Sequence, residues 1–305
     1  MIYIKDNIDM SRKSFFEKMR INVKGFNIKN IESLDRKLIE IKNVSDKVLE
    51  KLSKYLNENC INSLCISNEL MHNEKFMSFV EKKKLFYYDG KWLYKMLTEK
   101  ILEYIVYLKR EKFDELEISF VVNSVDKNIV YLISSIAQKV KLVNIITEDE
   151  RPFIKVKEKL FKEYGIVLNF GYGPKALLKS DIVLNYDFNE KEINKYIFPR
   201  KCVLINFKDD IKIKSKSFNG INVNGYNLNF SEKVIDVFKE LQGFDKNLLY
   251  ESYIYKNTLP ENILKRISED KIDVLNLCGI KGEIKRIEYL KNMKKMVNSL
   301  DKTEN

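Results

Sequence analysis

Polar and glycine residues follow several apolar runs in the second half of the chain. Runs such as Leu116 to Val122 have the length and composition of buried strands. The carboxyl ends of parallel strands meet at one edge of a sheet, and ligands of such sheets bind there. Side chains that form hydrogen bonds at that edge would hold a polar ligand. The candidate lining residues are Asn123, Ser124, Glu148, Gly171, Gly173, Asn185 and Asp187, with Asn206 beside them and Asp89 and Lys91 facing them.

The first strand-to-helix turn of this region lacks the residues that bind a dinucleotide. Dinucleotide-binding folds have the pattern GxGxxG there, because glycines permit a tight turn and let the pyrophosphate approach the backbone. This chain has the sequence NSVDKN at residues 123–128. The Val125 side chain fills space that a pyrophosphate needs, and Asp126 brings negative charge to a helix N-terminus. We therefore expect no NAD or NADP bound in the usual manner, assign no cofactor, and interpret Asp126 or Ser124 as a helix N-cap.

Two further loops have features of anion or ribose binding, and each has a structural alternative. Glu148 and Asp149 follow the second strand, where an acid would hold ribose hydroxyls, but acids also stabilise the first turn of the helix that Pro152 starts. The sequence GYGPK at residues 171–175 could present successive N–H groups and Lys175 to an anion. The same sequence is typical of a strand that turns into a helix.

The sequence indicates no other catalytic or metal-binding constellation. The single histidine, His72, has no nucleophile or acid partner in its sequence neighbourhood, so we interpret it as structural or exposed. The four cysteines, at positions 60, 65, 202 and 278, have no CxxC spacing and are expected to be free thiols in a reducing compartment. No metal site is expected, and the sequence leaves open whether the chain is an enzyme.

Apolar runs alternate with amphipathic runs from residue 37 onward, which predicts an α/β fold with parallel sheets. Residues 1–36 are not placed beyond a short apolar start and a helix-like stretch near Phe15 to Arg20. Strands are expected at 37–41, 62–66, 85–88, 116–122, 141–147, 165–170, 181–186, 202–207, 220–223 and 273–278. Helices are expected at 45–58, 69–83, 90–110, 126–139, 152–164, 174–179, 189–197, 232–241, 246–256, 260–269 and from 284 to about 300.

This layout resembles the two-domain dehydrogenases of the shikimate dehydrogenase and glutamyl-tRNA reductase kind. The segment SDIVLN at residues 180–185 is similar to the fourth strand of their Rossmann domain, which precedes a loop beside the nicotinamide. The resemblance implies two α/β domains, the second a Rossmann-like open parallel sheet, joined by a long connecting helix with a C-terminal helical return. The expected division is an N-terminal α/β domain (1–90), the connecting helix (91–110), a degenerate Rossmann-like domain (111–210) and a mainly helical region (211–305) that packs back on both domains.

The charge of the chain restricts the classes of partner. A formal net charge of +11 would suit a nucleic acid, but only 8 of the 55 basic residues are Arg, and the lysines are interspersed with glutamates as on solvated helix faces. This composition argues against nucleic-acid binding. No apolar run is long enough to span a membrane, and the start of the chain lacks the pattern of a signal peptide, so we expect a cytoplasmic protein without membrane insertion.

Two functions of different class remain open. One is a non-catalytic role in binding or assembly, with a dinucleotide site that has decayed. The other is an oxidoreductase-like enzyme acting on a nucleotide or a small polar metabolite in an interdomain crevice. The candidate partners are therefore a small polar metabolite, a nucleotide or another protein. The amide-rich lining favours the first, because it contains no general base, nucleophile or oxyanion-stabilising cluster.

Overall fold

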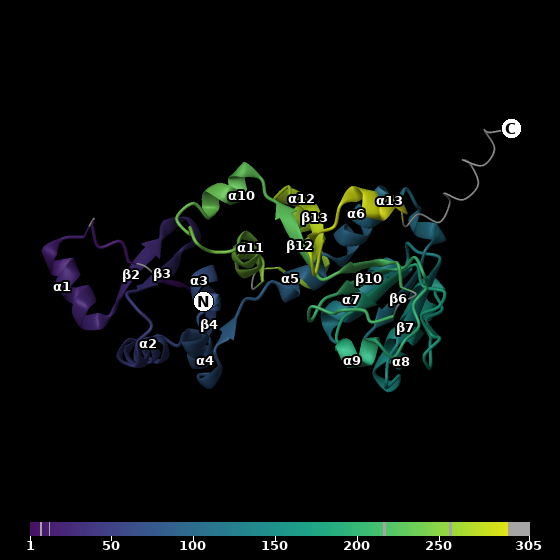
Figure 1. Ribbon diagram of the computed structural model, residues 1–305, viewed down its shortest axis with the longest axis horizontal. Coiled ribbons are helices and arrows are strands. Elements are labelled where there is room, and N and C mark those ends of the chain that lie inside the picture. Colours follow the sequence, from purple (N-terminus) through teal and green to yellow (C-terminus); the bar gives the residue numbers. More distant parts are fainter. Residues whose placement is uncertain (7, 12, 216–217, 256–257, 292–305) are drawn as a thin grey trace. The chain divides into compact units, whose positions relative to one another are not determined.

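The structure is a computed structural model that describes residues 1–6, 8–11, 13–215, 218–255 and 258–291 (Figure 1). It contains two sheets made mostly of parallel strands, with helices in the connections between them. The predicted α/β fold class is therefore confirmed. Among the described residues, no helix is both long enough and apolar enough to cross a membrane.

The chain forms two compact units, each made from two segments. Unit 1 comprises Met1–Trp92 and Phe230–Thr258, and unit 2 comprises Leu93–Asn229 and Leu259–Asn305. Residues 211–305 were predicted to form one region, but they are divided between the two units.

A five-stranded sheet in the order β2-β3-β1-β4-β5 organises unit 1. Strand β1 pairs in parallel with β3 on one side and β4 on the other, and β2 pairs antiparallel with β3. This central position of β1 was not predicted, because an apolar run so short has no usable periodicity. The strands are β1 (Ile2–Asp6), β2 (Phe26–Ile31), β3 (Arg36–Ile41), β4 (Ser63–Ile66) and β5 (Phe86–Tyr87).

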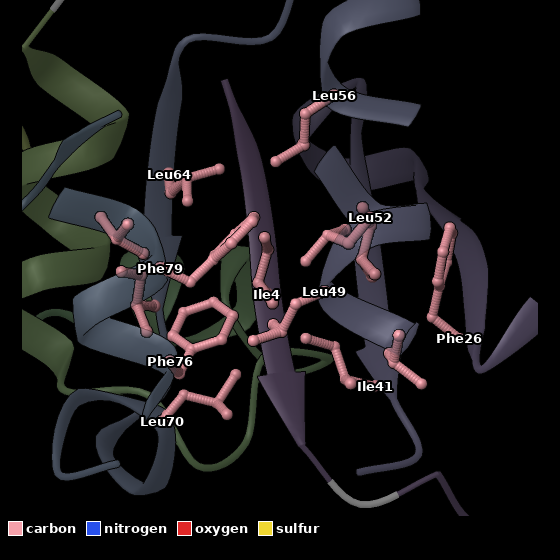
Figure 2. Close-up of a cluster of buried hydrophobic side chains, with 14 of the residues drawn as sticks. Ile4, Phe26, Ile41, Leu49, Leu52, Leu56, Leu64, Leu70, Phe76 and Phe79 are labelled. Atoms are coloured by element: carbon pink, nitrogen blue, oxygen red, sulfur yellow. The ribbon is translucent and has the colours of Figure 1, made fainter. Parts of the chain in front are cut away.

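One face of this sheet is covered by α2 and α4, whose apolar residues recur at intervals of three and four. In Figure 2, Ile4 of β1 lies between Phe76 of α4 and Leu49 of α2, and all three side chains are buried. The helices of unit 1 are α1 (Phe15–Lys24), α2 (Asp46–Glu58), α3 (Asn68–Met71), α4 (Glu74–Lys82), α10 (Glu232–Val237) and α11 (Lys246–Ile254), with a 3₁₀ turn at Glu32–Leu34.

The opposite face of the sheet contacts the inserted segment Phe230–Thr258. Alternate residues of a strand point to opposite faces, so Tyr3 faces away from Ile4. The Tyr3 hydroxyl lies 3.2 Å from Ser252 Oγ, and its ring packs edge-on against Phe244. The Gly90 N–H donates to the buried Glu251 carboxylate at 2.6 Å. Residues far along the chain therefore complete the core of unit 1.

Unit 2 contains a six-stranded parallel sheet in the order β11-β10-β9-β6-β7-β8. Numbered in chain order and read from β8 to β11, the order is 3-2-1-4-5-6, which is a strand order of doubly wound open sheets. The order reverses between β6 and β9, and this is the topological switch point. The strands are β6 (Glu117–Val121), β7 (Leu142–Ile146), β8 (Asn169–Phe170), β9 (Ile182–Asn185), β10 (Val203–Asn206) and β11 (Ile221–Val223).

The single long helix expected at 90–110 is interrupted. The structure has α5 (Lys91–Met96) and α6 (Thr98–Lys109), separated at Leu97, and the division between the units falls within α5. The Thr98 hydroxyl donates to the carbonyl of Lys95 at 2.5 Å, and its oxygen lies 2.8 Å from the Tyr186 hydroxyl, from which it can accept. A threonine that bonds to the preceding turn bends a helix, which accounts for the break.

Two other helix predictions for unit 2 require correction. Residues 174–179 form turns and no helix, because Gly173 and Pro174 initiate a turn that the chain does not extend. The helix expected at 189–197 is only the short α9. The helices of this part are α7 (Lys127–Ala137), α8 (Ile154–Tyr164) and α9 (Glu190–Ile193), with 3₁₀ turns at Phe113–Glu115 and Arg151–Phe153.

The expected helical return also contains strands. A three-stranded antiparallel sheet has the order β12-β13-β14 and belongs to unit 2. Of its strands only β13 was predicted, because β12 and β14 are polar and glycine-containing. The elements are β12 (Gly225–Asn229), α12 (Pro260–Glu269), β13 (Asp273–Gly279), β14 (Gly282–Glu283) and α13 (Arg286–Lys291). The rest of the expected terminal helix, residues 292–300, lies outside the described residues.

Candidate functional site

The candidate residues of unit 2 follow the carboxyl ends of four neighbouring strands. Asn123 and Ser124 come after β6, Asp187 after β9, and Glu148 after β7. Gly171 and Gly173 come after β8, and Asn185 is the last residue of β9. Because β6 and β9 pair side by side, Ser124 and Asp187 both lie at the switch point.

The Asp187 carboxylate accepts hydrogen bonds from the N–H groups of the loop after β6. Its Oδ2 accepts hydrogen bonds from the Ser124 N–H and hydroxyl, each at 2.9 Å, and both of its oxygens lie 2.9 Å from the Asn123 nitrogen. In a dinucleotide fold the N–H groups of this loop bind the pyrophosphate. In this chain they already bind an anion that the protein itself supplies.

The Asn123 side chain links the same loop to β7. Its Oδ1 accepts from the Glu148 N–H at 2.8 Å and from the Thr147 hydroxyl at 3.2 Å. The Thr147 hydroxyl also accepts from the Asp149 N–H at 3.2 Å. Asn123 therefore holds two strand ends together, and no pattern in the sequence indicated the part played by Thr147.

Two of the acids near this edge, Asp126 and Asp149, have structural partners. Asp126 is the N-cap of α7 and accepts from the Ile129 N–H at 2.8 Å, which confirms the capping interpretation. Asp149 forms a two-pronged ion pair with Arg151, in which Nε and Nη2 lie 2.8 and 2.7 Å from its oxygens. These hydrogen bonds from Arg151 lower the pKa of the Asp149 carboxyl. Glu148 is exposed.

Asn185 and Asn206 belong to a network of buried amides rather than an open surface. Both residues are 1% exposed. Asn185 Nδ2 donates to Asn206 Oδ1 at 3.1 Å, and Asn206 Nδ2 donates to the side-chain oxygens of Asn222 and Asn224, each at 2.8 Å. Asn224 Oδ1 in turn accepts from the Ile211 N–H at 3.1 Å. The network satisfies these amides internally, so the expectation that Asn185 and Asn206 line an open site is not met for their side chains.

The glycine loop after β8 has one N–H group committed to the sheet. The Gly171 N–H donates to the Ile145 carbonyl at 3.0 Å and is not free for an anion. A Cβ at Gly171 would lie 2.5 Å from Cδ1 of the buried Ile146, so packing favours glycine there. Gly173 has φ +68°, in the left-handed region, and is exposed together with Lys175. This geometry agrees with the turn alternative.

The loop variants provide a test of that interpretation. Gly173→Ala is expected to lower the free energy of unfolding by about 1 kcal/mol, because alanine is strained in the left-handed region while its Cβ meets nothing within 4 Å. Gly173→Asn should lose less, because asparagine tolerates this conformation. Urea denaturation of both variants would measure the difference. If both variants lose the same free energy of unfolding, backbone strain is not the reason that position 173 requires glycine.

Asp89 and Lys91 belong to unit 1, where they interact with each other. The Asp89 carboxylate accepts from the Lys91 N–H at 3.0 Å, and Lys91 Nζ lies 3.9 Å from its other oxygen. Asp89 thus initiates α5, as the capping alternative predicts. That these two residues face the crevice of unit 2 stays a prediction.

The described residues contain no cluster of His, Cys, Asp and Glu that could hold a metal ion. His72 is exposed, and its Nδ1 lies 2.7 Å from the Asn68 carbonyl of the preceding turn. The cysteines are free, and burial raises the pKa of the Cys202 thiol to about 12. At the switch point, Asn123, Ser124 and Asp187 form hydrogen bonds with one another.

Comparisons with known proteins give no family. No family model matches the chain, and no curated protein matches it. The solved structure of L-tryptophan dehydrogenase from Nostoc punctiforme is similar with a TM-score of 0.31 and 10% identity, over 88% of this chain and 87% of that one. A protein assigned as an aspartate carbamoyltransferase from Leishmania major Friedlin has a TM-score of 0.27 and 11% identity, over 68% and 71%. These scores carry no argument about function, so the site is interpreted from its own geometry.

Proposed function

We propose that the chain is a Rossmann-like protein that acts by binding or assembly, without nicotinamide chemistry, and that its dinucleotide site has decayed. The observation that carries this proposal is the Asp187 carboxylate, bound to the N–H groups of Asn123 and Ser124. The resemblance to two-domain dehydrogenases belongs to the same proposal. It accounts for the strand order and for the position of the anion site.

Displacement of Asp187 by a pyrophosphate would be costly. A hydrogen bond to a charged group contributes about 1.5–3 kcal/mol, and the carboxylate forms several of them. A phosphate arriving without displacing it would meet a second negative charge at close range. Val125 and Asp126 occupy the rest of the turn, where glycines would be required.

Titration calorimetry with NADH and NADPH tests the proposal. We expect no binding to the native chain, with any dissociation constant weaker than about 1 mM. The matched variant is Asp187→Ala, which frees the two N–H groups. Inorganic pyrophosphate should bind this variant more tightly than the native chain, because the variant has an unfilled anion position.

The decisive contrary result is micromolar affinity of the native chain for either cofactor. Turnover of a nucleotide or metabolite by the native chain would instead favour the enzyme alternative. The Asp187→Ala variant could also remain folded and bind pyrophosphate no better than the native chain. That result would show that the carboxylate is not what prevents pyrophosphate from binding.

A further inference from the structure

Helix α1 of unit 1 exposes an apolar stripe. The exposed fractions of its side chains are 72% for Phe15, 79% for Phe16, 54% for Met19 and 70% for Val23. Of the ten residues of this helix, only Ile21 is buried. At about 100° per residue, the four exposed side chains fall within an arc of about 100°, and Ile21 lies on the opposite side. The helix is thus amphipathic with its apolar face directed away from the sheet.

The ends of α1 are fixed, so the stripe is held in place. Ser14 forms a capping box with Glu17, and Gly25, at φ +87°, ends the helix with its N–H bonded to the Ile21 carbonyl. Lys42 Nζ donates to Asn22 Oδ1 at 2.7 Å. A ten-residue helix is marginal in water without such support. The fold therefore stabilises an apolar surface that unit 1 does not use for its own core.

A groove of about 630 Å³ runs between α1 and α2 beside this stripe. Phe26 and Tyr55 line it, and Lys24 Nζ lies 4.7 and 5.1 Å from the centres of their rings. The lining contains one carboxylate and several cations. The charged lining residues are Arg20, Lys24, Lys51, Lys54 and Glu58.

We propose that α1 and the adjoining groove bind an anionic lipid surface. Exposed phenylalanines flanked by lysines are the composition of a helix that lies in the plane of a membrane interface. Cations stand on both sides of the stripe, Lys18 on one side and Arg20 and Lys24 on the other, as a planar anionic surface requires. Binding of this kind needs no membrane-spanning helix.

The geometry favours a lipid surface over two other occupants. A second copy of the chain would bring the same cations together, which like-charge repulsion opposes. A helix of a partner protein seated in the groove would leave Phe15 uncovered, because Phe15 is not among the residues that line the groove. A plane covers Phe15 and the groove side of the helix together.

Co-sedimentation with vesicles tests the proposal. The probes are pure phosphatidylcholine vesicles and vesicles with about one quarter phosphatidylglycerol. We expect binding to the anionic vesicles only, weakening as salt is raised, because salt screens the attraction. The variant Phe15→Ser with Phe16→Ser should bind at least about tenfold more weakly, since the apolar contacts are lost. Arg20→Gln with Lys54→Gln should weaken binding about twenty-five-fold, at about fivefold per cation.

The matched control is Phe161→Ser, which removes a phenylalanine of α8 that is 61% exposed on unit 2. This variant should bind like the native chain. Because Phe15 and Phe16 are exposed, their replacement should leave thermal unfolding unchanged. Failure of the native chain to bind anionic vesicles would overturn the proposal. A protein partner would then be the favoured occupant of this surface. Equal binding to neutral vesicles, or equal loss in the Phe161 control, would overturn it as well.

Discussion

Asp187→Ala is expected to lower the free energy of unfolding by about 2–4 kcal/mol. The Asp187 carboxylate accepts from two backbone N–H groups and one hydroxyl, and hydrogen bonds to a charged acceptor contribute about 1.5–3 kcal/mol each. The expected loss is smaller than the sum of these three contributions because the side chain is only partly buried. Urea denaturation monitored by circular dichroism would measure the loss.

The control for this variant is Asp114→Ala, which removes an exposed aspartate of the same unit and should change stability by less than about 0.5 kcal/mol. Added sulfate should then stabilise Asp187→Ala more than it stabilises the native chain, because the anion can occupy the emptied position. Sulfate stabilises folded proteins in general, so the informative quantity is the extra stabilisation of the variant over that of the native chain. An Asp187→Ala loss no larger than the control's would mean that the carboxylate does not hold the switch point together.

Lys109→Met is expected to cost about 3–5 kcal/mol. Lys109 is 1% exposed, and its Nζ lies 3.1 Å from Oε2 of Glu111, whose exposed fraction is 12%. Apart from this ion pair, neither oxygen of Glu111 has a hydrogen-bond partner among the described residues. Methionine would fill the space of the lysine stem but leave a carboxylate in the interior without its cation, and an uncompensated buried charge is strongly destabilising. Equilibrium unfolding in urea would measure the effect.

The double variant Lys109→Met with Glu111→Gln should recover most of that loss, because it removes both charges. Lys100→Met is the surface control on the same helix. Lys100 Nζ lies 3.3 Å from a carboxylate oxygen of Glu103. Both side chains are more exposed than those of Lys109 and Glu111, so this pair should contribute less than about 1 kcal/mol to stability. If Lys109→Met proves no worse than Lys100→Met, the buried ion pair is not a determinant of the stability of unit 2.

The sequence predicted the sheet of unit 2 because its strands contain continuous apolar runs, such as Ile182 to Leu184, and are separated by amphipathic helices. It did not predict where helices stop when a side chain competes for the backbone, as Thr98 does between α5 and α6. It also missed strands without an apolar pattern, such as β12. Their positions depend on pairing with distant strands, which local periodicity does not encode.

The candidate site was predicted as a set of positions but not as a network. Sequence reasoning placed Asn123, Ser124 and Asp187 at one sheet edge, since parallel strand ends meet there. It interpreted them as groups available to a ligand, whereas in the structure they bind one another. Whether two polar groups 63 residues apart form a mutual hydrogen bond depends on loop conformation, which the residue types alone do not determine.

The discontinuity of unit 1 has a consequence for the order of events during synthesis. Strand β1 emerges from the ribosome well before its partners, because the residues that contact Tyr3 on its second face, Phe244 and Ser252, follow more than two hundred residues later. All six strands of the parallel sheet of unit 2, up to Val223, are synthesised in between. The second unit's sheet can therefore assemble while the first still exposes an unfinished apolar face, and this interval is when the nascent chain is most exposed to aggregation.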